Sequence, residues 1–195
     1  MGQRLGVLGG TFDPIHVGHL VAAVNARHAL GLDKVLMVVA NDPWQKSGRP
    51  VTAAADRLAV VEAAVAGRDG LEASRIEIDR GGESYTADTL EQLADANPDG
   101  ELFLIVGTDV AAELGTWRRI EVARRLSTLV VVSRPGATAP ELDAGWRVEH
   151  VEIPRLEVSA SDLRDRARAG LPLDYLVPDG AIELIRRLGL YAGGR

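Results

Sequence analysis

Residues 9–19, which read Gly-Gly-Thr-Phe-Asp-Pro-Ile-His-Val-Gly-His, constrain the fold of this chain more than any other stretch. The preceding residues 4–8 form a short apolar run of strand length, and apolar residues recur at helical spacing over residues 20–30. This order predicts a strand, a tight turn and a helix. The start of such a helix presents free backbone N–H groups and a positive dipole end, which favours the binding of phosphate.

The glycines and histidines of this stretch fit the same chemistry. Gly9 and Gly10 let the main chain approach a ligand closely, and Gly18 leaves room beside the first helical turn. His16 and His19 are three residues apart and would share one face of a helix. Two imidazoles at a helix start can donate hydrogen bonds to negative charge that develops on phosphate, so the stretch predicts phosphate transfer.

A zinc site is the alternative interpretation of the His-x-x-His pair. Zinc would need further ligands, and the chain contains no cysteine to supply them. The two remaining histidines, His28 and His150, stand in no ligand-like spacing. The absence of cysteine also excludes a disulfide framework and a cysteine nucleophile.

The whole stretch is more specific than its parts, because Thr-Phe-Asp-Pro precedes His-x-Gly-His. It resembles the signature of the HxGH nucleotidyltransferases, which are similar in fold to the catalytic domains of class I aminoacyl-tRNA synthetases. Within that group it most resembles bacterial nicotinate-nucleotide adenylyltransferases. The resemblance implies that Asp13 contacts nicotinate mononucleotide, and that ATP is bound by Gly9, Gly10, Thr11, Phe12, His16 and His19.

Length and charge bound the remaining possibilities. A chain of 195 residues with 46% hydrophobic residues is expected to fold as one domain over residues 1–195, with a helical C-terminal part over about 159–195. The net charge of −6 disfavours a nucleic-acid partner. No apolar run is long enough to cross a bilayer and no signal segment precedes the first strand, so we expect a cytoplasmic protein without a membrane partner.

Apolar runs of strand length alternate with helical segments along the chain. This alternation predicts an α/β fold with a Rossmann-like, doubly wound and mostly parallel sheet. Ligands of such sheets bind beyond the carboxyl ends of the strands. The expected strands begin near residues 4, 35, 76, 102, 129 and 148.

Three candidate residues follow two of these strands. Asp109, after residues 102–106, can accept hydrogen bonds from a ribose or can cap a helix, and its residue type leaves both roles open. The resemblance favours ATP binding by Gly107 and Asp109. Arg134 follows the strand that ends near residue 133, and the resemblance implies that it binds nicotinate mononucleotide, since a planar cation suits phosphate.

In the resembled family, two further candidates correspond to residues that contact nicotinate mononucleotide. Thr86 is expected to be a helix N-cap, and the resemblance adds that this threonine turn faces the nicotinate ring. Trp117 could belong to the core or stack on a flat ring. The resemblance implies stacking on nicotinate.

A polar loop over residues 41–50 follows the second strand. In the resembled family this loop carries a Pro-Pro-His-Lys-like element whose lysine reaches the phosphates. Here the sequence is Pro-Trp-Gln-Lys, so Lys46 is a candidate while a solvated loop lysine is the alternative. Arg57, on the helix that follows, is expected to be a surface charge.

A second helix start is expected near residue 160. Ser159 and Asp162 form a capping-box-like opening. In the resembled family an Ile-Ser-Ser-Thr-x-Ile-Arg-like motif binds the ATP phosphates here. The resemblance therefore adds Ser159, Ser161 and Arg164, whereas Ala160 departs from the motif and lacks its hydroxyl.

The resemblance implies transfer of AMP from ATP to nicotinate mononucleotide, which forms nicotinate adenine dinucleotide and pyrophosphate in NAD biosynthesis. The catalytic residues would be His16, His19, Lys46 and Arg164, with Mg²⁺ held mainly through the ATP phosphates. The alternatives are an enzyme like phosphopantetheine adenylyltransferase and an ATP-binding module without turnover. Related enzymes are often homo-oligomers, so a homo-oligomer is a further expectation.

Overall fold

The computed structural model describes residues 2–43, 50–137 and 141–193, which contain a six-stranded sheet. The strands follow the order β3-β2-β1-β4-β5-β6. Three neighbouring pairs, β1 with β4, β4 with β5 and β5 with β6, run parallel. The strands are β1 (Arg4–Gly10), β2 (Lys34–Val39), β3 (Leu71–Ser74), β4 (Glu101–Gly107), β5 (Ser127–Ser133) and β6 (Val148–Glu152).

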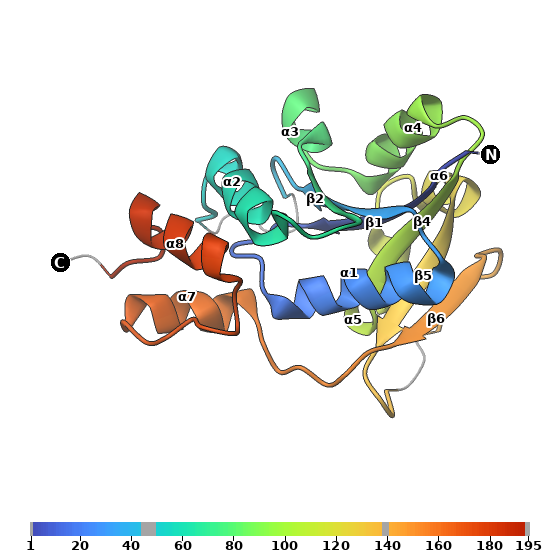
Figure 1. Ribbon diagram of the computed structural model, residues 1–195. Helices are drawn as coiled ribbons and strands as arrows, with labels where there is room; N and C mark the ends of the chain where they lie inside the picture. Colours follow the sequence, from blue (N-terminus) through green and yellow to red (C-terminus); the bar gives the residue numbers. More distant parts are fainter. Residues whose placement is uncertain (1, 44–49, 138–140, 194–195) are drawn as a thin grey trace. The chain divides into compact units, whose positions relative to one another are not determined.

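Helices alternate with these strands, as the Rossmann-like prediction requires (Figure 1). The prediction of an α/β fold with a mostly parallel sheet is therefore confirmed. The helices are α1 (Val17–Leu30), α2 (Ala54–Val65), α3 (Ile76–Arg80), α4 (Thr86–Ala96), α5 (Thr108–Ala112), the 3₁₀ helix η2 (Leu114–Thr116), α6 (Ile120–Leu126), α7 (Ala160–Arg168) and α8 (Asp179–Leu188).

The chain folds into two compact units that interleave along the sequence. The first unit comprises Met1–Gly9, Val21–Leu36 and Tyr85–Arg155. The second unit comprises Gly10–Leu20, Met37–Ser84 and Leu156–Arg195. A single domain over residues 1–195 stays a prediction.

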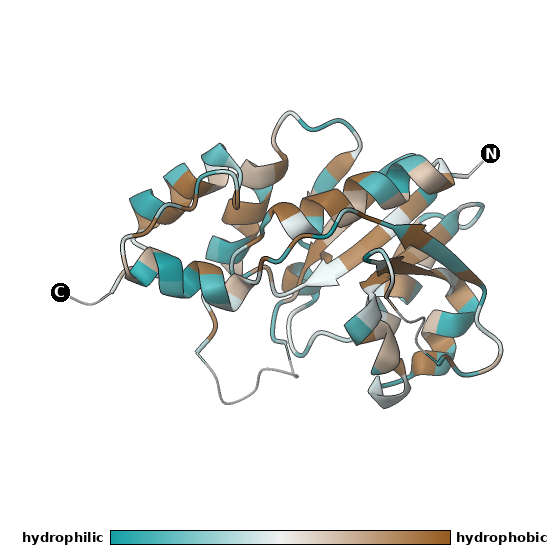
Figure 2. Cartoon of the chain, turned by 90° about the horizontal axis from the view of Figure 1, so that it is seen from below, coloured by the Kyte–Doolittle hydropathy of each residue, from teal (hydrophilic) through white to brown (hydrophobic). Residues whose placement is uncertain are grey.

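The first unit is built on β4 and its neighbours. The central residues of β4 and β5 are buried, as continuous apolar strands of a parallel sheet are when both faces are covered. Most of the strand ribbon is correspondingly hydrophobic in Figure 2. Helices α5 and α6 pack on β5, and α6 also packs on α4.

In the second unit, α8 packs on α2 (Figure 1). Gly180 permits this close approach, because a Cβ atom at this position would lie 3.0 Å from the Ala63 carbonyl oxygen. The remaining faces of α8 are exposed, which gives this helix an amphipathic pattern.

Within the described ranges, no helix has the length and apolar character that crossing a membrane would require.

Two local expectations are wrong. The strand expected near residue 76 is the short helix α3, and β3 precedes it, because two alternating isoleucines fit either period over so short a run. Thr86 is the first residue of α4, and the N-cap position belongs to Tyr85, whose side chain makes no capping hydrogen bond. The expected cap at Ser159 is confirmed, since its Oγ accepts a hydrogen bond from the Asp162 N–H at 3.1 Å.

Candidate active site

The turn between β1 and α1 is buried over most of its length. Phe12 is 2% exposed and has a positive φ of 48°, an uncommon conformation for a residue with a side chain. Its ring covers Gly10, where an added Cβ atom would lie 2.9 Å from Phe12 Cζ. The glycine is therefore required by close packing at this position.

The two histidines of the turn contact each other directly. Their rings stack with centroids 3.7 Å apart at an interplanar angle of 26°, and Phe12 meets the His19 ring edge-on at 4.9 Å. The His16 backbone N–H donates a hydrogen bond to His19 Nδ1 at 3.2 Å. Because Nδ1 accepts, the proton of a neutral His19 lies on Nε2, which makes that atom a hydrogen-bond donor.

His16 is the more deeply buried of the pair. It is 8% exposed, and burial lowers the pKa of His16 to about 4, so the ring is neutral at pH 7. Its Nδ1 atom has no hydrogen-bond partner within the described ranges. A Cβ atom at Gly18 would lie 3.0 Å from this Nδ1, so Gly18 makes room for the His16 ring.

Asp13 is bonded within the protein through both of its carboxylate oxygens. Oδ1 accepts a hydrogen bond from the Tyr191 hydroxyl at 2.7 Å, and Oδ2 accepts one from the Thr52 N–H at 3.4 Å. The residue is 4% exposed. The structure thus places Asp13 inside the turn's own bonding network, and its contact with nicotinate mononucleotide stays a prediction.

Helix α7 connects the second motif to the same turn. The Arg164 guanidinium donates one hydrogen bond to the Asp13 backbone carbonyl at 2.8 Å and another to Ser161 Oγ at 3.1 Å. Arg164 therefore links two segments that lie 151 residues apart in the sequence. This contact brings the second predicted phosphate motif against the first.

Arg57 is buried, which makes the expectation of a surface charge wrong. It is 1% exposed and donates hydrogen bonds to the backbone carbonyls of Thr11 at 2.7 Å, Thr52 at 2.7 Å and Asn41 at 3.2 Å. Burial lowers the pKa of the Arg57 guanidinium, and the nearby Asp13 carboxylate opposes that shift. One buried cation thus fixes three loop segments of the second unit.

The structure also identifies two residues that the sequence interpretation missed. Arg57 lies four residues before Val61 and seven before Ala64, both buried, so its place on the apolar face of α2 was a usable signal. No comparable pattern marks Tyr191, because its contact with Asp13 spans 178 residues.

Three predicted residues of the first unit lie at the carboxyl ends of β4 and β5. These strands pair in register, with Gly107 opposite Val132, so Gly107 and Arg134 follow one edge of the sheet. Gly107 is the N-cap of α5, and Asp109 is the second residue of that helix, which rules out the capping role considered for Asp109. Asp109 and Arg134 are both exposed and available to a ligand.

Thr86 and Trp117, which are also predicted to bind nicotinate mononucleotide, belong to the first unit as well. The segment after Trp117 contacts the segment before Thr86, because Arg118 donates a hydrogen bond to the Tyr85 hydroxyl at 3.2 Å. Trp117 is half-buried, and its buried indole N–H has no hydrogen-bond partner within residues that the structure describes. The Trp117 ring is therefore partly accessible, and its indole N–H is a donor without a partner among the described residues.

Arg119 connects the same two segments. Its guanidinium forms ion pairs with Asp88 and Glu91 on α4, each at 2.7 Å. Arg119 has a positive φ of 56° at the N-cap of α6. Exposed charges thus hold the Trp117 segment on α4.

The structure brings His16, His19, Ser161 and Arg164 together around one turn of the second unit. Ser159 belongs to the same motif as the cap of α7. Lys46 lies outside the described residues. Gly9, Thr86, Gly107, Asp109, Trp117 and Arg134 belong to the first unit.

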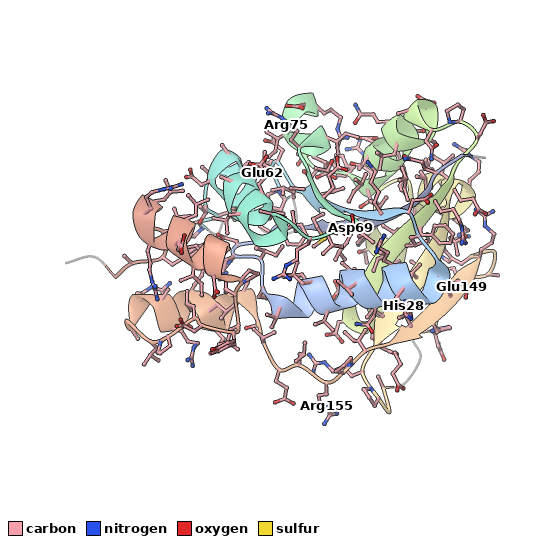
Figure 3. The ribbon with its side chains drawn as sticks, in the orientation of Figure 1. His28, Glu62, Asp69, Arg75, Glu149 and Arg155 are labelled. Atoms are coloured by element: carbon pink, nitrogen blue, oxygen red, sulfur yellow. The ribbon has the colours of Figure 1, made fainter. Side chains whose placement is uncertain are left out.

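No cluster of three or more histidine, cysteine or acidic side chains that could hold a metal ion occurs in the described part of the chain. His28 lies exposed on α1 (Figure 3). Asp13, the acidic residue of the turn, already uses both carboxylate oxygens.

Comparison with known proteins decides the family. Residues 7–166, which include both motifs, match the family model described as cytidylyltransferase-like. The chain belongs to the cytidylyltransferase-like family. This membership agrees with the resemblance to nucleotidyltransferases that the first motif carries.

Curated relatives narrow the place of this cytidylyltransferase-like chain within its family. It is 45% identical over 191 residues to a protein of Corynebacterium kroppenstedtii named as a probable nicotinate-nucleotide adenylyltransferase, covering 96% of this chain and 90% of the relative. It is 46% identical over 189 residues to a Streptomyces coelicolor protein of the same name, covering 95% and 100%. The resemblance to this group is therefore confirmed over nearly the whole chain.

A solved structure supports the fold of this cytidylyltransferase-like chain. The nicotinic acid mononucleotide adenylyltransferase of Plasmodium falciparum, complexed with NaAD, superposes with a TM-score of 0.79 and covers 97% of both chains. The two sequences are only 16% identical. The similarity thus extends to the fold of the whole chain.

Proposed function

We propose that this protein transfers AMP from ATP to nicotinate mononucleotide, forming nicotinate adenine dinucleotide and pyrophosphate. The observation that carries the proposal is the contact of Arg164, from the second motif, with the turn that holds the stacked His16 and His19. The curated relatives named as nicotinate-nucleotide adenylyltransferases, 45% and 46% identical, support this choice of acceptor.

The reaction requires one bond to form and one to break. A phosphate oxygen of nicotinate mononucleotide attacks the α-phosphorus of ATP, and the bond from that phosphorus to the bridging oxygen of the β-phosphate breaks. Pyrophosphate leaves with the electron pair. Because the attacking oxygen is already anionic, the protein has to supply positioning and charge stabilisation, without a covalent intermediate.

The second unit supplies groups suited to the ATP phosphates. His19 can donate from Nε2, and Arg164 carries a fixed positive charge beside Ser161. His16 is neutral at pH 7 and acts as a hydrogen-bonding group without a full charge. These groups would stabilise charge that grows toward the leaving pyrophosphate. Lys46 is proposed to assist them.

Further residues are proposed for the binding of the two substrates. We assign ATP contacts to Gly9, Gly10, Thr11, Phe12, Gly107, Asp109 and Ser159, and acceptor contacts to Asp13, Thr86, Trp117 and Arg134. The exposed Asp109 can accept hydrogen bonds from a ribose, and the partly accessible Trp117 ring can stack on nicotinate.

Magnesium is proposed to enter bound to ATP. Its ligands would be mainly phosphate oxygens, because Mg²⁺ prefers oxygen ligands and binds substrate phosphates readily. A bound Mg²⁺ ion would neutralise phosphate charge. The cytoplasmic location and the homo-oligomer stay predictions.

The test is pyrophosphate release from ATP and magnesium, with nicotinate mononucleotide, nicotinamide mononucleotide or phosphopantetheine offered in parallel. We expect release that depends on nicotinate mononucleotide. Release with phosphopantetheine alone would overturn the assigned acceptor and favour the related adenylyltransferase. ATP binding without release in any arm would favour the module without turnover.

A further inference from the structure

The tail that follows α8 returns to the histidine turn. Helix α8 ends at Leu188, and Gly189, with a φ of 65°, is its C-cap. Tyr191 then has a positive φ of 61° and donates a hydrogen bond from its hydroxyl to Asp13 Oδ1 at 2.7 Å. This hydrogen bond anchors the tail to the turn that holds the histidines.

Asp13 connects Tyr191 to the surrounding segments through further hydrogen bonds. Its other carboxylate oxygen accepts from the Thr52 N–H, and its backbone carbonyl accepts from Arg164. Asp13 lies three residues before His16, within the same turn. A shift of Asp13 would therefore displace the turn, the start of the segment that leads into α2, and Arg164 together.

The surroundings make this hydrogen bond strong. Burial and the Asp13 carboxylate both raise the pKa of the Tyr191 phenol, so it remains a proton donor at neutral pH. Asp13 is 4% exposed, which keeps water from competing for the carboxylate. A hydrogen bond to a buried charged group is stronger than one between neutral groups.

We propose that Tyr191 is a positioning residue for the ATP-phosphate site, because its hydrogen bond to Asp13 holds the His16 and His19 turn and Arg164 in their working arrangement. Tyr191 acts through Asp13 and touches no substrate. The proposal rests on the proposed function for its catalytic consequence alone. Its structural consequence can be measured in the free protein.

The variant that removes this contact is Tyr191→Phe, which lacks the hydroxyl and keeps the ring. The matched control is Tyr175→Phe, since Tyr175 belongs to the same unit, has a positive φ of 63° and is 91% exposed. Both substitutions remove one hydroxyl. Only Tyr191→Phe also removes a hydrogen bond to the buried Asp13.

Steady-state kinetics measure the catalytic consequence. In Tyr191→Phe, kcat/KM for ATP should fall on the order of tenfold with a raised KM for ATP, since one hydrogen bond to a charged group is lost. A loss of folded protein would lower kcat alone and leave both KM values unchanged. Tyr175→Phe should match the wild type in every constant.

Hydrogen exchange in the free protein measures the structural consequence. The Thr52 amide, which donates to Asp13, should exchange roughly tenfold faster in Tyr191→Phe, together with the amides of residues 15–19. The first-unit amides of β4 and β5 should keep their protection. Tyr175→Phe should leave all of these rates unchanged.

The outcomes separate this inference from the proposed function. A wild type without acceptor-dependent pyrophosphate release contradicts the proposed function, and the exchange comparison then still decides the role of Tyr191. Exchange rates in Tyr191→Phe equal to those of the wild type would overturn the inference. It would also be overturned by faster exchange throughout both units, or by unchanged ATP kinetics in an active enzyme.

Discussion

The histidine turn of the second unit and the predicted ligand-binding residues of the first unit are held in place by opposite means. In the second unit, His16, Asp13 and Arg57 are 8%, 4% and 1% exposed. In the first unit, Asp109 and Arg134 are exposed. The turn is thus fixed by buried hydrogen bonds, whereas the Trp117 segment is tied to α4 by the exposed ion pairs of Arg119.

This difference affects how each region responds to change. A buried polar group whose partner is removed loses a hydrogen bond that water cannot replace, so its loss is costly. Exposed ion pairs are screened by water and salt and contribute little. We therefore expect substitutions of the buried network to have large effects and those of the exposed ion pairs to have small ones.

The largest effect is expected for Arg57→Met, which keeps the apolar stem and removes the cation. The carbonyls of Thr11, Asn41 and Thr52 lose their donor in a buried site. The free energy of unfolding should fall by about 3–5 kcal/mol, measured by urea denaturation. The control is Arg75→Met, an exposed arginine (Figure 3), which should cost about 0.5 kcal/mol or less. Equal losses would remove the distinction between the two environments.

The burial of His16 predicts that the free energy of unfolding depends on pH. Burial lowers the pKa of His16 to about 4, while an unfolded chain has the ordinary value near 6.5. As pH falls through this window, the unfolded state takes up a proton that the folded state does not, so stability decreases. The loss reaches about 3 kcal/mol by pH 4. Urea midpoints between pH 4 and 7 should show a shallower acid dependence in His16→Gln, and parallel curves would contradict this account.

His19→Ala tests the chemical role of the turn. Turnover should fall about a hundredfold, which corresponds to about 2.7 kcal/mol of transition-state stabilisation. The far-ultraviolet circular dichroism should stay that of the wild type. His28→Ala removes an exposed histidine from the same helix and should leave turnover unchanged. Full turnover in His19→Ala would show that His19 has no catalytic role.

The smallest effect is expected at Arg119. Arg119→Ala and Arg119→Gly both remove the ion pairs with Asp88 and Glu91, but only glycine relieves the positive φ of 56°. The glycine variant should therefore melt about 2–4 °C above the alanine variant. The difference between Arg119→Ala and the wild type should shrink at high salt. A salt-independent difference would mean that this contact behaves as a buried one.

Local patterns predicted much of the fold. The apolar runs located five of the six strands, and Ser159 was correctly identified as the cap of α7. The short run at residues 76–79 was misassigned because two isoleucines cannot distinguish a helix from a strand. Thr86 was predicted to be the N-cap of α4 but is the first residue of the helix, since the cap depends on where the preceding chain enters the helix.

The sequence by itself determined the two motifs, the alternation of strands and helices, and the family. Such features depend on local spacing, which a single sequence displays directly. Only the tertiary structure decided that Arg57 is buried, that Arg164 meets Asp13, and that Tyr191 returns to the turn. Those contacts join residues distant in sequence, and a buried charge persists only where the fold brings several hydrogen-bond partners to the same place.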